Sequence, residues 1–189
     1  LNESGLNQAR LLGARVLQDY GTRVSKVYCS NHLRCRQTAQ GVLDAFTLSP
    51  EVEIDPILQE RNFGDLRGKP WSEVTAHPEH RALFEKERTD YRPPNGESQI
   101  DFEARVDQIH ESILSVLQRI PEGRVLLVVT HGLVKQSLMR RKFPGGDRSK
   151  FGKPFGNTSL SEVLVDGTGH HVVRLNCTAH VQDSLQSNL

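Results

Sequence analysis

The stretch Arg124–Gly132, R-V-L-L-V-V-T-H-G, decides the fold. Its five consecutive apolar residues, three of them β-branched, are typical of a strand that is buried on both faces, as in a parallel sheet. The residues that follow, L-V-K-Q-S-L-M, predict a helix. His131 is therefore expected at the carboxyl end of a buried strand, which is where open α/β sheets bind their ligands.

Two features of this strand end suit an anion. Gly132 lets a substrate approach the backbone closely. The helix that begins there offers free N–H groups, including that of Leu133, to a phosphate. A histidine at a strand end is also often hydrogen-bonded to its own loop, and on spacing alone the two interpretations carry equal weight.

The size and composition of the chain set limits on its class. Its 189 residues suit a single domain over 1–189, with 25% charged and 36% hydrophobic residues. A net charge of +1 supplies no strong positive field that would attract nucleic acid or an acidic membrane. No apolar run is long enough to span a bilayer. The three cysteines are an odd number in no metal-type spacing, so we expect reduced thiols in a cytoplasmic protein.

Helical and strand patterns alternate along the chain. Asn2 is expected to cap a helix that runs to Tyr20, and Ser98 or Asp101 opens a long amphipathic helix. Further expected elements are strands at Val24–Ser30 and Val52–Leu58, helices after Ser30 and over Trp71–Arg88, a hairpin of Ser159–Val165 and His171–Cys177, and a flexible tail at Thr178–Leu189. This alternation predicts a three-layer α/β/α sandwich with a mostly parallel central sheet.

Several charged residues stand where they could carry chemistry. Arg34 follows the first expected strand, and a guanidinium matches phosphate oxygens with its planar fork. Glu60 and Arg61 open a glycine-bearing loop, where a carboxylic acid could protonate a leaving oxygen. Glu97 and Ser98 precede the long helix. Each also has a simpler interpretation: a solvated arginine, a surface Glu–Arg pair, and an ordinary helix start.

Taken together, these segments resemble the histidine phosphatase superfamily, with its phosphoglycerate-mutase-like fold. The resemblance runs from Leu1 to about Val165 and rests on five motifs in the family's order. They are L-N-E-S-G-L-N-Q-A, Y-C-S-N-H-L-R-C-R-Q-T-A, L-Q-E-R-N-F-G-D-L-R-G, P-N-G-E-S and V-V-T-H-G. Each motif alone is weak, but five in order form a strong signal.

The resemblance implies a two-step phosphoryl transfer without metal or cofactor. In the family, a histidine of an R-H-G motif near the N-terminus attacks phosphorus. By this resemblance Arg34, His131, Gly132 and Leu133 would bind the phosphoryl group, and Glu60 would protonate the departing oxygen. Arg61, Glu97, Ser98 and Asn157 are expected to contact the substrate. The other histidines, among them His32 and His110 on expected helix surfaces, receive no role.

The family's R-H-G motif and first strand are absent from this sequence. Loss of an inner strand would leave buried backbone groups unpaired, at about 1–3 kcal/mol each, against a total stability of about 5–15 kcal/mol. The sequence also begins without methionine, so its numbering need not start where the natural protein does. We therefore expect a truncated record of a complete enzyme rather than a natural pseudoenzyme.

Within the superfamily, the short region between Glu60 and Pro93 favours a phosphatase over a phosphoglycerate mutase. The expected substrate is a phosphomonoester of a small metabolite. The C-terminal V-V-R-L-N-C-T-A-H-V-Q-D-S-L is similar to the tail of TIGAR-type fructose-2,6-bisphosphatases, which implies a sugar bisphosphate. Two alternatives remain: a phosphoglycerate mutase, and a catalytically dead member that only binds a phospho-ligand or partner.

Overall fold

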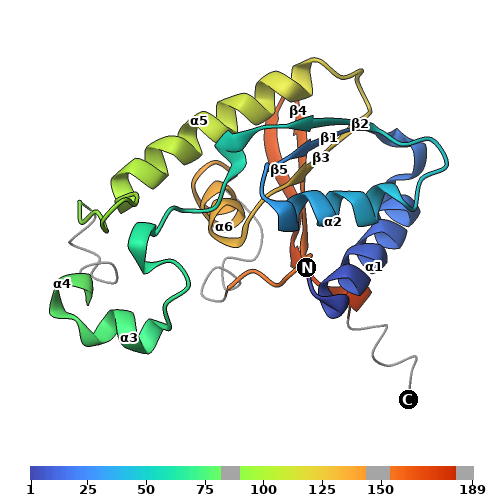
Figure 1. Ribbon diagram of the computed structural model, residues 1–189. Coiled ribbons are helices and arrows are strands. Elements are labelled where there is room, and N and C mark those ends of the chain that lie inside the picture. The colour runs from blue at the N-terminus through green and yellow to red at the C-terminus, as the bar shows by residue number, and fades with distance from the viewer. Residues whose placement is uncertain (82–89, 144–153, 182–189) are drawn as a thin grey trace.

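The structure is a computed structural model that describes residues 1–81, 90–143 and 154–181 (Figure 1). Its helices are α1 (Glu3–Tyr20), α2 (Leu33–Leu43), α3 (Trp71–Ala76), α4 (Pro78–Arg81), α5 (Gln99–Gln118) and α6 (Gly132–Arg141). Its strands are β1 (Val24–Cys29), β2 (Glu51–Ile54), β3 (Val125–Val129), β4 (Leu160–Asp166) and β5 (Gly169–Cys177). No helix in these described ranges is both long enough and apolar enough to cross a membrane.

Three strands form a parallel sheet in the order β2-β1-β3, and β4 and β5 form a separate antiparallel hairpin. Cys29 is level with Ile54 on one side and with Val129 on the other. The chain therefore leaves all three parallel strands at the same edge of the sheet. The segments after β1, β2 and β3 therefore meet at this edge.

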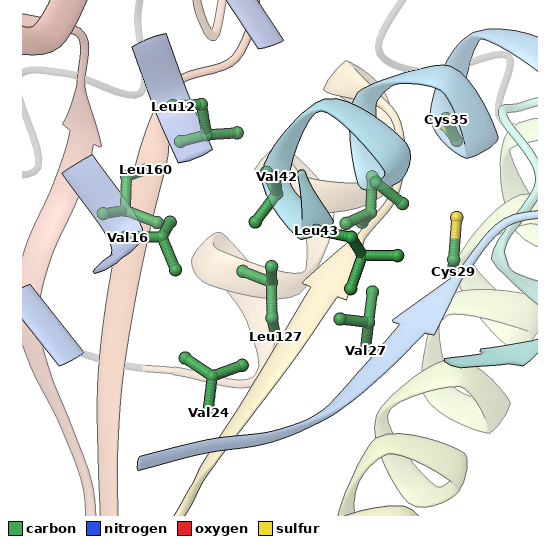
Figure 2. Close-up of a cluster of buried hydrophobic side chains, with 12 residues drawn as sticks. Leu12, Val16, Val24, Val27, Cys29, Cys35, Val42, Leu43, Leu127 and Leu160 are labelled. Atoms are coloured by element: carbon green, nitrogen blue, oxygen red, sulfur yellow. The ribbon is translucent and has the colours of Figure 1, made fainter. Parts of the chain in front are cut away.

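Helices cover both faces of the sheet, which confirms the predicted three layers. Alternate side chains of β1 point to opposite faces: Val27 and Cys29 join a core cluster with α1 and α2, and Tyr28 joins a second cluster with α5 and α6. Figure 2 shows the first cluster, in which Leu127 of β3 packs beside Val42 of α2.

Helices α1 and α2 pack closely because a glycine lies on each of them at the crossing. A Cβ atom on Gly13 would lie 2.6 Å from the carbonyl oxygen of Gly41, and one on Gly41 would lie 2.7 Å from Cβ of Ala9. The two backbones thus approach without side chains between them. This contact fixes α2, whose N-terminus faces the carboxyl edge of the sheet.

The strand β3 has a neighbouring strand on one side only within the described residues. Val125, Leu126 and Val128 are half-buried, whereas the β1 side chains are buried except for Ser25. The expectation of a strand buried on both faces is thus met only in part. Both core clusters nevertheless extend to the hairpin, since Leu160 belongs to the first and Leu175 to the second.

Local signals set most element boundaries correctly. Asn2 caps α1 by accepting a hydrogen bond from the Gly5 N–H (2.9 Å). Of the two candidates for the start of the long helix, Ser98 is the N-cap, and it forms a capping box with Asp101. The strand expected over Val52–Leu58 is wrong in its length, because β2 ends at Ile54 and Pro56 begins a short 3-10 helix.

The expected flexible tail at Thr178–Leu189 is wrong for its first residues. Residues 179–181 form a helical turn, and His180 is buried. The single helix expected over Trp71–Arg88 is wrong in its described part, which is divided into α3 and α4 at His77. The rest of that expected helix falls in 82–89, which lies outside the described residues, as do 144–153 and 182–189.

Candidate active site

The loops after β1 and β3 bring Arg34 and His131 into direct contact. Arg34 lies in the first turn of α2, and its Nη2 and Nε atoms are 2.7 and 3.2 Å from Nδ1 of His131. A guanidinium only donates hydrogen bonds, so Nδ1 must accept and the imidazole is neutral. Its proton then lies on Nε2, which can donate to Oγ of Ser30 at 2.9 Å.

The environment of His131 keeps it neutral. The side chain is 5% exposed. Burial lowers the pKa of His131 to about 3, and the nearby charges of Arg34, His32 and Arg105 act in the same direction. At neutral pH the site therefore has a neutral imidazole held by a cationic fork.

Glu60 lies beside the N-terminus of α6, the helix that begins directly after His131. Its Oε2 accepts a hydrogen bond from the Leu133 N–H (3.2 Å), and its Oε1 accepts one from the Arg61 N–H (3.0 Å). The carboxylate of Glu60 thus contacts the N-terminus of α6, where the free N–H groups and the helix dipole favour a negatively charged group. A Cβ atom on Gly132 would lie 4.0 Å from Oε2 of Glu60, an ordinary contact distance.

Arg105 of α5 fixes the loop that carries Glu60. It donates to the carbonyl oxygens of Ile57 (2.9 Å) and Gln59 (2.8 Å) and forms a two-point ion pair with Glu97, at 2.7 and 2.9 Å. Burial alone would raise the pKa of Glu97, but the bonds from Arg105 and from the Asn62 N–H hold it below its usual value. Sequence reasoning missed Arg105, because its position in mid-helix gives no signal.

The side chains of three expected substrate contacts have other partners or other positions in the structure. Arg61 is 9% exposed, lies over the ring of Phe63 and donates to Oε1 of Gln99. Ser98 is buried and caps α5, whereas Asn157 lies in an exposed turn before β4. Within the described residues none of the three hydrogen-bonds to Arg34 or His131. Their expected contacts with a substrate stay predictions.

His32 is a site residue that sequence reasoning left without a role. It is the N-cap of α2, and its ring lies edge-on to that of His131, with 4.9 Å between the ring centroids. The available signal was its position between Ser30 and Arg34 in the second motif. The site also includes Cys35, whose Sγ is 3.5 Å from Nε2 of His131.

In the described part of the chain, no group of three or more His, Cys, Asp or Glu residues could hold a metal ion.

Comparison with known proteins places this geometry in context. Residues 1–178 match the sequence model of the histidine phosphatase superfamily (branch 1). The chain is 33% identical to phosphoglycerate mutase-like protein 4 of Arabidopsis thaliana, covering 97% of this chain and 77% of that protein. It is 34% identical to a 2,3-bisphosphoglycerate-dependent phosphoglycerate mutase of Rhizobium meliloti, covering 90% of this chain and 87% of the relative.

Solved structures show the same architecture. Bacillus stearothermophilus YhfR superposes with a TM-score of 0.76 at 28% identity, covering 96% of this chain and 86% of that one. A putative alpha-ribazole-5'-P phosphatase from Escherichia coli superposes with a TM-score of 0.78 at 24% identity, covering 94% and 84%. The relatives thus include proteins named as mutases and as phosphatases.

Proposed function

The chain belongs to the histidine phosphatase superfamily (branch 1), and from this we propose that the complete protein is a phosphatase. It hydrolyses a phosphomonoester of a small metabolite through a phosphohistidine intermediate. The observation that carries the proposal is the convergence of Arg34, His131 and Glu60 at the carboxyl edge of the parallel sheet. These residues come from three separate motifs, and they surround the N-terminus of α6.

Each residue has a distinct task in the proposed reaction. Arg34, His131 and the N–H groups at the start of α6 bind the oxygens of the transferring phosphoryl group. Charge neutralisation and positioning supply most of the catalysis in such transfers. Glu60, in its protonated form, gives its proton to the departing alcohol oxygen, and then takes a proton from the water that releases phosphate.

The proposed nucleophile is the histidine of an R-H-G segment, a tripeptide that does not occur in these 189 residues. The sheet offers a place for such a segment. The second edge of β3 pairs with no described strand, and both core clusters reach past β3 to the β4–β5 hairpin. A strand added there would end beside His131, because β1 and β3 both end at that edge.

Phosphatase and mutase differ in what receives the phosphoryl group from the enzyme: water in one case, a second alcohol in the other. The short region between Glu60 and Pro93 supports the phosphatase, and the 34% identity to a phosphoglycerate mutase supports the other candidate. A sugar bisphosphate substrate rests on the tail resemblance alone. The three free cysteines support our proposal of a reducing, cytoplasmic location.

Product analysis by ³¹P NMR tests the proposal. The chain, preceded by an R-H-G-bearing segment, is incubated with a panel of sugar phosphates, phosphoglycerates and p-nitrophenyl phosphate. We expect inorganic phosphate as the product. Migration of phosphate between the hydroxyls of phosphoglycerate without release would establish the mutase instead. Binding of the panel without any turnover would establish a phospho-ligand-binding protein.

A further inference from the structure

The carboxylate of Glu60 is placed by backbone groups. In the described part of the chain, both hydrogen bonds to this carboxylate come from backbone N–H groups, those of Arg61 and Leu133. Among these residues, no side chain donates to it. The position of its oxygen atoms therefore depends on how the backbone of the Glu60 loop, residues 57–62, is held.

One guanidinium holds this backbone up to Glu60 itself. Nη1 of Arg105 donates to the carbonyl oxygens of Ile57 (2.9 Å) and Gln59 (2.8 Å). Its Nη2 donates to the carbonyl oxygen of Glu60 (3.3 Å). Three carbonyl groups within four consecutive residues are thus bound by a single side chain.

Glu97, the ion-pair partner of Arg105, holds the backbone beyond Glu60. Its carboxylate binds Nε and Nη2 of Arg105 at 2.7 and 2.9 Å, and its Oε2 also accepts from the Asn62 N–H (2.8 Å). The N–H of Glu97 donates to the Asn62 carbonyl oxygen (2.7 Å).

The contacts of Arg105 require a guanidinium. With the bonds to Glu97 and to the three carbonyl groups, Arg105 uses all five of its N–H donors. The side chains of Arg105 and Glu97 are only 18% and 19% exposed, so solvent competes little for these bonds. A lysine, whose donors all lie on one nitrogen, could not reproduce this set of contacts.

We propose that Arg105 is a positioning residue for proton transfer by Glu60, acting through the backbone of the Glu60 loop and through Glu97. This inference rests on the proposed function, in which Glu60 protonates the departing oxygen. A general acid must lie within about 2.6–3.2 Å of that oxygen, and a displacement of about 1 Å can slow the reaction by about 100-fold. Arg105 should therefore matter only for substrates that need the proton.

Benzyl phosphate and p-nitrophenyl phosphate separate this role from a general loss of structure. Both are aromatic esters of similar size, but only the benzyl alkoxide needs a proton to leave. The readout is kcat/KM of the chain preceded by an R-H-G-bearing segment, since it reports the steps up to departure of the alcohol. In R105M it should fall by about 100-fold for benzyl phosphate and by less than about threefold for p-nitrophenyl phosphate.

Three variants serve as controls for R105M. R105K keeps the charge but not the fork, so it should show the same selective loss. R119M removes a matched two-point pair with Glu53 (3.0 and 3.2 Å), about 20 Å further along α5, and should change neither kcat/KM value. R105M/E97Q leaves no unpaired carboxylate, so it replaces R105M if circular dichroism shows that the single variant is unfolded.

The double variant R105M/E60Q tests whether Arg105 acts through Glu60. If it does, the double variant should have the same ratio of the two kcat/KM values as E60Q alone. A ratio that combines the losses of both single variants would overturn the inference. Equal slowing of the two esters in R105M, or the unmodified ratio in R105K, would overturn it as well.

A measurement without turnover separates this inference from the function on which it rests. The Leu133 amide donates to Oε2 of Glu60, so its NMR signal in the 189-residue chain reports the position of that carboxylate. We expect R105M to shift the signal in the same direction as E60A, and R119M to leave it unchanged. An unshifted signal in R105M would overturn the inference but leave Glu60 as the acid. Equal slowing of both esters in E60Q would overturn the acid role, and the inference with it.

Discussion

Protonation of His131 should make the fold sensitive to acid. The pKa of this histidine is about 3 in the folded chain and 6.5 in the unfolded reference, so the unfolded state binds a proton more readily. A folded pKa below the unfolded one means that stability is unaffected above pH 6.5 and decreases as the pH falls from 6.5 toward 3. At about pH 4.5, two units below the unfolded pKa, His131 alone should cost about 3 kcal/mol, because each pH unit contributes about 1.4 kcal/mol.

The variant His131→Asn isolates this contribution. Asparagine does not titrate, and its side-chain oxygen can still accept from Arg34. Urea unfolding followed by circular dichroism, at about pH 7.5 and about pH 4.5, gives the loss of stability in each protein. The unmodified chain should lose about 2–3 kcal/mol more than the variant. A second variant, His171→Asn, changes an exposed histidine and should follow the unmodified chain. Equal losses in the unmodified chain and His131→Asn would refute the account of His131 as a buried, neutral group.

Three further predictions concern the site and the loop beside it. Arg34→Met should weaken binding of inorganic phosphate by about 10–100-fold in a calorimetric titration, because the charge-assisted two-point contact between the guanidinium and the phosphate is lost. Unchanged affinity would remove Arg34 from the site. In the chain preceded by an R-H-G-bearing segment, Glu60→Gln should slow hydrolysis of alkyl phosphates far more than that of p-nitrophenyl phosphate, whose leaving group needs no proton. Equal slowing of both substrates in steady-state assays would show that Glu60 is not the acid. Gly64→Ala should lower the free energy of unfolding, measured by urea titration, by at least about 2 kcal/mol. The reason is that φ of Gly64 is +55° and the new Cβ would lie 1.9 Å from the Pro94 carbonyl oxygen. A smaller loss would mean that the loop shifts freely.

Sequence patterns predicted the parts of this fold that local chemistry decides. Asn2 was expected as a helix start, and Ser98 as one of two candidates beside Asp101, because a short polar side chain before an apolar periodic segment can accept a hydrogen bond from a free N–H of the first turn. The approach of Arg34 to His131 was expected because both follow parallel strands, whose carboxyl ends meet at one edge. The resemblance to known motifs supplied the family and the roles that the residues alone left open.

Other features depend on contacts that no local pattern encodes. His32 was placed on a helix surface, but as an N-cap its ring turns toward the sheet edge and meets His131. Arg105 fixes the Glu60 loop from the middle of a helix, where an arginine is ordinarily solvated. His180 is buried although it lies in a mostly polar C-terminal segment, so its burial follows from packing and not from the composition of that segment.

Detection of a phosphoenzyme is the most direct test of the central claim, that these residues serve transfer to a histidine on an added strand. The 189-residue chain and the same chain preceded by an R-H-G-bearing segment are each mixed with p-nitrophenyl phosphate and quenched in alkali, which preserves phosphohistidine. We predict acid-labile protein phosphate and continued phosphate release only from the extended chain. Equal turnover by the 189-residue chain alone would contradict the claim, because another residue would then attack phosphorus. A folded, phosphate-binding extended chain that forms no phosphohistidine would contradict it as well.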